Sequence, residues 1–199
     1  MKKILFIFVA AIAVLSSCSK ANVDQKSDND TSITKGAAQA TINEQNVLVK
    51  WVQLWKNGPK FAEYNVGVTD GKAESLGEFC TWAEDVVSSR WGGKWRLPTR
   101  GEFQGLLDNC KCDWAKLNNV WGLKCTGKDE YGENSVFFPS TIEWDYEVDD
   151  WGDYFCGRYW SSDHDDLGHS AFLFFYSDRS VVGVLPSHYQ FSIRAVLAE

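Results

Sequence analysis

Three features that would assign a protein to a familiar class are missing from this sequence. Beyond residue 15 there is no apolar run of about 20 residues, the length that crosses a bilayer as a helix. The 20 Lys and Arg residues are outnumbered by 27 Asp and Glu, and the net charge of −7 argues against nucleic acid, which needs a basic surface. No Gly-x-Ser-x-Gly sequence and no phosphate-binding glycine loop occur, so the chain shows no catalytic constellation of those kinds.

The N-terminus has the sequence pattern of a secretion signal. Lys2 and Lys3 precede an apolar run over residues 4–15 that is too short to span a bilayer stably. The next residues, Ser16-Ser17-Cys18, complete a sequence that resembles a lipobox, in which the chain is cut before the cysteine and the thiol receives a diacylglycerol. We therefore predict a signal peptide over residues 1–17 and a lipidated Cys18. The alternative is an ordinary signal peptide with a coincidental cysteine.

The lipid is then predicted to anchor the chain to the membrane. One domain is predicted C-terminal to the anchor. Residues 18–45 are polar and poor in aromatics, and we expect a flexible tether because they cannot bury enough apolar surface to fold. A single globular domain is predicted over residues 46–199. Aromatics make up 15% of the chain, with 10 Trp and 16 Gly, which favours a loop-rich fold over a helical bundle.

The predicted domain contains five cysteines besides Cys18. Export places them in an oxidising compartment, where disulfides are permitted, and the odd number leaves at least one thiol free or paired outside the chain. We expect a disulfide from Cys110 or Cys112 to Cys125, because their segments are predicted to be neighbouring strands. The single Cys-x-Cys sequence does not predict a zinc site.

Local patterns predict an α+β domain. Thr99 and Glu102 have the spacing of a capping box, and the apolar residues that follow predict a helix ending near Asp108-Asn109. Residues 82–90 are expected to form a short helix or an irregular insert. Strands are predicted over residues 47–54, 60–68, 120–126, 135–138, 159–161, 171–176, 181–185 and 192–197. Helices early and strands late are typical of an α+β fold.

Six sequence pieces, in order along the chain, carry a resemblance to a known family. They are Glu63-Tyr64-Asn65-Val66-Gly67; Thr81-Trp82-Ala83-Glu84; Trp91-Gly92-Gly93-Lys94-Trp95-Arg96-Leu97-Pro98-Thr99 with Glu102-Phe103; Asn134-Ser135-Val136-Phe137-Phe138-Pro139; Gly157-Arg158-Tyr159-Trp160-Ser161-Ser162; and Phe191-Ser192-Ile193-Arg194-Ala195-Val196. Together they resemble the Fibrobacter succinogenes major paralogous domain over roughly residues 47–199. This family is common in lipoproteins and surface proteins of Bacteroidetes-type bacteria. The resemblance therefore implies an outer-membrane lipoprotein, facing either the cell surface or the periplasm.

The resemblance also implies a C-type-lectin-like fold, related to that of formylglycine-generating enzymes. Such a domain has small twisted antiparallel sheets, two short helices and long loops. Those enzymes depend on a cysteine pair near the C-terminus, and this chain has no cysteine after Cys156. The Glu-Pro-Asn or Gln-Pro-Asp loop and the Trp-Asn-Asp segment of calcium-dependent sugar-binding lectins do not occur either. We therefore expect no enzymatic activity and no cofactor, and whether calcium is bound stays open.

Five apolar residues of the resembling pieces are expected to pack in the core, where aromatic and aliphatic side chains of strands and helices usually lie. Those residues are Trp95, Leu97, Phe103, Trp160 and Val196. Arg96 and Arg194 stand in apolar surroundings, and we expect a buried carboxylate partner for each rather than a ligand.

Residues 161–189 have an unusual composition. They include no Lys, Glu, Gln, Met or Trp and are rich in Asp, His, Ser and aromatic residues. Strand alternation puts residues 171, 173 and 175 on one face, which the family's pattern assigns to the core. The opposite face, with Phe172, Phe174 and Tyr176, is then expected to be exposed beside short polar residues, which is typical of a recognition surface.

The acidic residues between positions 143 and 166, with three nearby histidines, match no metal motif, and we expect a solvated acidic face rather than a cation site. The predicted ligand-binding residues are Asp163, His164, Asp165, Asp166, His169, Ser170, Phe172, Phe174, Tyr176, Asp178, His188 and Tyr189.

Two explanations of this composition stay open. Randomised adenines in Asn codons cannot yield the missing residue types, and diversity-generating retroelements change the C-terminal ends of C-type-lectin-like proteins in that way; chance is the other explanation. The first functional hypothesis is a non-catalytic domain that binds an unknown protein or glycan through residues 161–189. The alternatives are a structural or pilus-associated surface protein and, more weakly, an enzyme of the formylglycine-generating type.

Overall fold

The structure is a computed structural model that describes residues 35–42, 48–143 and 154–198. The predicted signal peptide, Cys18 and the first part of the predicted tether lie outside these residues, as do residues 144–153 of the acidic segment. Within the described residues, no helix has the length and apolar character needed to cross a membrane. The elements are β1 (Lys35–Ile42), β2 (Leu48–Gln53), β3 (Lys60–Ala62), β4 (Cys80–Thr81), α1 (Ser88–Trp91), β5 (Trp95–Arg96), α2 (Arg100–Asn109), β6 (Lys111–Leu117), β7 (Val120–Thr126), the 3-10 helix η1 (Asp129–Tyr131), β8 (Ser135–Pro139), β9 (Thr141–Glu143), β10 (Tyr154–His164), β11 (His169–Phe175), β12 (Ser180–Pro186), β13 (Gln190–Phe191) and β14 (Val196–Leu197).

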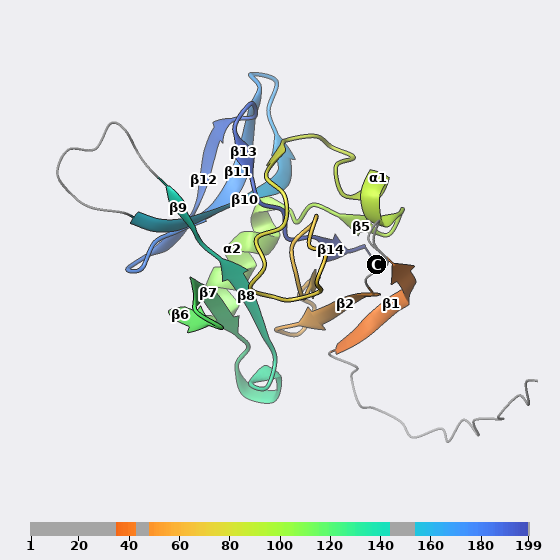
Figure 1. Cartoon of the computed structure of the whole chain (residues 1–199), viewed down its shortest axis with the longest axis vertical. Helices are drawn as coiled ribbons and strands as arrows, with labels where there is room; N and C mark the ends of the chain where they lie inside the picture. The colour runs from red at the N-terminus through yellow and green to blue at the C-terminus, as the bar shows by residue number, and fades with distance from the viewer. Residues whose placement is uncertain (1–34, 43–47, 144–153, 199) are drawn as a thin grey trace, which may run out of the picture. The chain divides into compact units, whose positions relative to one another are not determined.

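The largest sheet brings the two ends of the domain together. Its strand order is β1-β2-β3-β14-β5, and every neighbouring pair is antiparallel. Val196 of β14 lies opposite Phe61 of β3 on one side and Arg96 of β5 on the other. Figure 1 shows the dark blue end of the chain, β14, returning to the strands of the first part of the domain. The C-terminal strand therefore closes the domain.

Strand β1 corrects the predicted start of the domain. The sequence predicts a tether over residues 18–45, but Lys35–Ile42 is a strand paired with β2, with Lys35 opposite Val52. The residues of β1 are mostly small or polar, so they give no apolar pattern. An edge strand is held by backbone hydrogen bonds, which almost any composition can make. The ordered domain therefore begins before residue 46.

The remaining strands of the described residues form three further small sheets. Strands β9 to β12 make an antiparallel sheet in the order β12-β11-β10-β9, β6-β7-β8 make a second, and β4 pairs with β13. Across β10, β11 and β12, Trp160 lies opposite Phe172 and Phe172 lies opposite Gly183. The described chain is thus a loop-rich α+β domain made mostly of small antiparallel sheets, with the two helices α1 and α2.

Two hydrophobic clusters form the core, and β11 contributes to both. Phe172 packs in one cluster with Trp160 and Phe191, while Leu173 and Phe175 pack in the other. All the residues predicted for the core are buried: Trp95, Leu97, Phe103, Trp160 and Val196.

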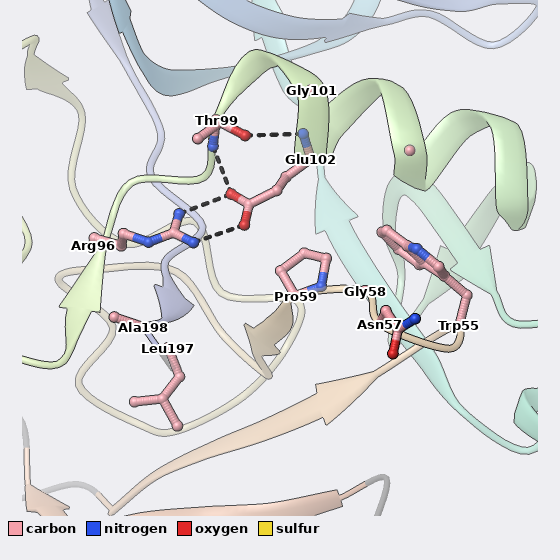
Figure 2. Close-up of a pocket in the computed structure, with 11 residues that line it drawn as sticks. Trp55, Asn57, Gly58, Pro59, Arg96, Thr99, Gly101, Glu102, Leu197 and Ala198 are labelled. Atoms are coloured by element: carbon pink, nitrogen blue, oxygen red, sulfur yellow. Dashed lines mark hydrogen bonds and ion pairs between the residues drawn. The ribbon is translucent and has the colours of Figure 1, made fainter.

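Helix α2 begins at the predicted capping box. Thr99 Oγ1 accepts a hydrogen bond from the Glu102 N–H (3.0 Å), and the Thr99 N–H donates to Glu102 Oε2 (2.7 Å). Phe103 and Leu106 are the buried face of the helix. Arg96 donates to both carboxylate oxygens of Glu102, at 2.8 and 2.7 Å (Figure 2), so the predicted carboxylate partner of Arg96 is confirmed, but the pair is partly exposed rather than buried.

Within the described residues the hydrogen bonds of Arg194 go to neutral acceptors, so its predicted buried carboxylate partner is wrong. This fully buried guanidinium donates to Asn65 Oδ1 (2.9 Å) and to the backbone oxygens of Ala62 (3.0 Å) and Phe137 (2.6 Å). Burial lowers the pKa of Arg194 to about 10, although the charge of the partly buried Glu63 acts in the opposite direction, so the group is still charged at neutral pH. Neutral acceptors replace a carboxylate because each supplies a lone pair without adding a second buried ion.

A disulfide joins Cys112 to Cys125 across β6 and β7, where the two residues are directly opposite. It is one of the two pairings that the sequence predicts. Cys110, at the end of α2, is a buried thiol, and burial raises its pKa to about 11.

Candidate functional site

The first predicted site residues form the turn between β10 and β11. Asp165 Oδ1 accepts hydrogen bonds from the N–H groups of Leu167 (2.9 Å) and His169 (2.8 Å), and Asp165 Oδ2 lies 3.2 Å from His169 Nδ1. The hydrogen bond from the His169 N–H is the main reason why the pKa of Asp165 lies below its usual value. Gly168 closes the turn with a φ of 81°, a conformation that favours glycine. Asp165 and His169 therefore hold the turn, and Asp166 is exposed beside them.

Asp163 connects this hairpin to helix α2. Its Oδ2 accepts a hydrogen bond from the Arg100 N–H at 2.6 Å, and its own N–H donates to Ser161 Oγ at 3.2 Å. A carboxylate at the first turn of a helix is favoured by the helix dipole and satisfies an N–H group that has no partner within the helix. Asp163 thus positions the hairpin on the helix.

His164 and Ser170 belong to a small polar cluster. The His164 ring stacks on Trp82 with 4.2 Å between ring centroids, and its Nδ1 lies 2.9 Å from Ser170 Oγ and 3.2 Å from Ser187 Oγ. Trp82 is fixed in turn by a hydrogen bond from its Nε1–H to Ser161 O, at 2.8 Å. The hydroxyls of Ser170 and Ser187 are 2.8 Å apart. Among the described residues, the partners of His164 Nδ1 are these two hydroxyls rather than a carboxylate.

Phe172 is not the exposed residue that the sequence predicts. It is buried against Trp160 (centroids 6.2 Å apart) and Phe191 (5.1 Å). Phe191 belongs to β13 and comes from a later part of the chain, and it covers the face that strand alternation leaves to solvent. Phe174 and Tyr176, on the same face of the chain, are half-buried.

Beyond Phe172 the same face carries an unbroken series of ring and guanidinium contacts, which we call the aromatic row. Its members are Arg179, Tyr176, Phe174, Arg158, Phe191, Tyr189 and His188. Arg158 lies between two rings, 5.2 Å from the Phe174 centroid and 5.7 Å from that of Phe191.

The two ends of the aromatic row are exposed. At one end, Arg179 lies 5.5 Å from the Tyr176 ring in the turn between β11 and β12, where Asp178 is also exposed. At the other end, Tyr189 is 45% exposed, and His188 stacks on it with centroids 4.6 Å apart. Phe191 is the buried floor between them.

No family model, no curated protein and no solved structure matches this chain.

The aromatic row has the chemistry of a contact surface. Aromatic side chains offer large apolar area at little cost in conformational entropy, and arginine adds directional hydrogen bonds. Within the described residues, no group of three or more His, Cys, Asp or Glu side chains is placed to hold a metal ion.

Sequence reasoning found only part of this surface. Phe174, Tyr176, His188 and Tyr189 are among the predicted ligand-binding residues, but Arg158, Arg179 and Phe191 are not. Arg158 lies directly opposite Phe174 across β10 and β11. Its position two residues before Trp160 is the signal that could have found it, because alternate residues of a strand share a face.

Proposed function

We propose that this protein is a non-catalytic binding lipoprotein, anchored through Cys18, that recognises a protein or glycan through the aromatic row. The observation that carries the proposal is the continuous contact series from Arg179 to His188, which includes the cross-strand pair of Arg158 and Phe174. Aromatic and Arg residues dominate the binding energy of protein interfaces, and side chains already held against one another lose little entropy on binding.

We also propose that the domain has a C-type-lectin-like fold of the major paralogous type. The order of the six resembling sequence pieces supports this proposal. Small antiparallel sheets, two short helices and long loops are the features that the resemblance implies, and they are features of the described chain.

A structural or pilus-associated role is the second candidate, and strand β12 is the observation that favours it. This strand lies at the edge of its sheet and leaves Val181 (43%) and Val184 (48%) exposed. No charged residue occurs between residues 180 and 187, although charges are a common protection of edge strands. A partner subunit could add a strand at this edge.

The composition of residues 161–189 supports a further proposal, that a retroelement diversifies them. This segment supplies Phe174, Tyr176, Arg179, His188 and Tyr189 of the aromatic row, while Arg158 and Phe191 flank it. We expect a near-copy of the segment beside the gene, with adenines at the differing codon positions, and a reverse transcriptase gene close by. If a complete genome sequence contains neither, diversification is wrong and chance explains the composition.

The binding proposal is tested by a triple substitution, Phe174→Ser, Tyr176→Ser and Tyr189→Ser. Phe172 is left unchanged because it is buried and its loss would disturb folding. We expect binding to an immobilised panel of surface proteins and glycans of host and neighbouring cells to fall at least about tenfold. Circular dichroism checks that the fold is intact.

Val184→Ser is the matched control, because Val184 is exposed on the opposite face of β12. It should leave panel binding unchanged. Loss of assembly with the Val184 variant, and unchanged panel binding with the triple variant, would instead favour the structural role.

A further inference from the structure

A pocket that shares no residue with the aromatic row lies beside helix α2. It is a pocket of about 480 Å³ between the turn after β2, the first turns of α2 and the end of the chain. It is lined by Trp55, Asn57, Gly58, Pro59, Arg96, Thr99, Gly101, Glu102, Gly105, Leu197 and Ala198. Figure 2 shows Arg96, Thr99 and Glu102 joined at one wall, and Trp55, Asn57 and Pro59 at another. The volume lies in the range of small-molecule sites, roughly 300–1,000 Å³.

Two glycines of α2 keep the helix side of this pocket open. Gly101 and Gly105 are four residues apart, so they lie on one face of the helix. A Cβ at position 105 would lie only 3.2 Å from the Trp55 ring, so this glycine makes room for the indole. A Cβ at position 101 would meet nothing closer than Thr99 Oγ1 at 3.8 Å. Packing within the domain therefore does not require Gly101, although glycine lowers helix stability.

The opposite wall is a tight turn that presents an aromatic ring and an amide. The Gly58 N–H donates to Trp55 O (3.0 Å), and Gln53 Nε2 donates to Gly58 O (2.8 Å). Gly58 lies directly against the Trp55 indole, which is half-buried. Asn57 has a φ of 61°, and its exposed side chain offers both a hydrogen-bond donor and an acceptor.

The charges of the pocket cancel within it. The Arg96 guanidinium and the Glu102 carboxylate form a two-hydrogen-bond pair, and Glu102 also accepts the Thr99 N–H. Three of the first N–H groups of α2 are occupied as well, since Asp163 accepts from Arg100 and Thr99 accepts from Glu102 and Phe103. Among the described lining residues the one cationic and the one anionic side chain are paired with each other, so an uncharged ligand is favoured.

We propose that this pocket binds a short neutral saccharide. A sugar ring carries C–H groups on its faces and hydroxyl groups around its edge. The C–H faces suit the apolar wall of Trp55, Pro59 and Leu197, and the hydroxyls suit the exposed Asn57 amide, which offers both a donor and an acceptor. This inference does not depend on the aromatic row, because the two sites share no residue.

The test is isothermal titration of the full-length protein with cellobiose, maltose, lactose and N,N′-diacetylchitobiose. Glucuronate and glucosamine serve as the anionic and cationic comparison sugars. We expect at least one neutral disaccharide to bind and both charged sugars to bind more weakly. Absence of binding by all four neutral sugars, or tighter binding of a charged one, overturns the proposal.

Two variants locate the binding. Asn57→Gly removes the amide without strain at a positive φ, and Asn119→Gly (φ 70°, in the turn between β6 and β7) is its matched control. Gly101→Leu fills the pocket from the helix, and Gly93→Leu is its control because nothing lies within 4 Å of a Cβ there. We expect each pocket variant to lose about tenfold in affinity and each control to lose none.

The triple variant of the aromatic row separates the two proposals. It should bind the neutral sugar as the unchanged protein does. Loss of sugar binding in this variant, or its retention in both pocket variants, shows that the saccharide binds elsewhere and overturns the pocket assignment. Failure of the pocket assignment leaves the proposed function of the aromatic row intact.

Discussion

Among single residues, Arg194 is held by acceptors that no neighbouring position in the sequence provides. We predict that Arg194→Met lowers the free energy of unfolding by about 3 kcal/mol, because it leaves Asn65 Oδ1 and the oxygens of Ala62 and Phe137 buried without their donor. Chemical denaturation followed by fluorescence measures the change. Arg100→Met, at an exposed position, is the control and should change stability by less than about 0.5 kcal/mol. A similarly small effect of Arg194→Met would show that the guanidinium is not needed to satisfy these oxygens.

The two arginines show which residue roles a sequence can predict. Arg96 and Glu102 are close in the chain and belong to one capping motif, so the pairing follows from local spacing. The partners of Arg194 come from β3, the loop after it and β8, and only the folded chain brings them together. The prediction that Phe172 is exposed fails for the same reason. Strand alternation gives the face of the sheet on which Phe172 lies, but it cannot show that Phe191, from a later part of the chain, covers that face.

Among elements, the strength of the local signal decides which predictions hold. The capping box and apolar spacing predict α2, and the predicted strand over residues 120–126 coincides with β7. Of the strand predicted over residues 60–68, only Lys60–Ala62 forms a strand, β3. Beyond it the backbone bonds to other segments, such as Val66 N–H to Ile193 O. Strand β1 is missed because pairing at a sheet edge requires no apolar pattern.

The hairpin of β6 and β7 carries a prediction at this scale. Its Cys112–Cys125 disulfide closes a short loop with a sequence separation of 13. We predict that reduction lowers the free energy of unfolding by about 3 kcal/mol, because the reduced chain gains conformational entropy when it unfolds. Thermal melts with and without dithiothreitol measure the effect. A Cys112→Ala/Cys125→Ala variant should be insensitive to the reductant, and a shift of equal size in that variant would mean that the reductant acts elsewhere.

At the scale of the whole molecule, the binding proposal requires an anchor, an ordered domain and an accessible surface in one chain. Strand β1 begins at Lys35, so at most residues 18–34 are left for the tether that the sequence predicts. Under the binding proposal, a shorter tether keeps the proposed ligand surface closer to the membrane and reduces the range of partners that it can reach.

The anchor is tested by Cys18→Ser in the full-length protein expressed in a lipoprotein-producing bacterium. We predict that the unchanged protein sediments with the membranes and incorporates radiolabelled palmitate, because one thiol at the cleavage site receives the lipid. The variant should lose the label and move to the soluble fraction. Ser27→Thr, a conservative change in the predicted tether outside the lipobox, is the control and should stay with the membranes. Protease treatment of intact cells then distinguishes the two faces of the outer membrane, since only a surface-exposed domain is cleaved. A Cys18→Ser variant that stays membrane-bound would show that something other than the lipid holds the protein, and the anchoring role of Cys18 would be wrong.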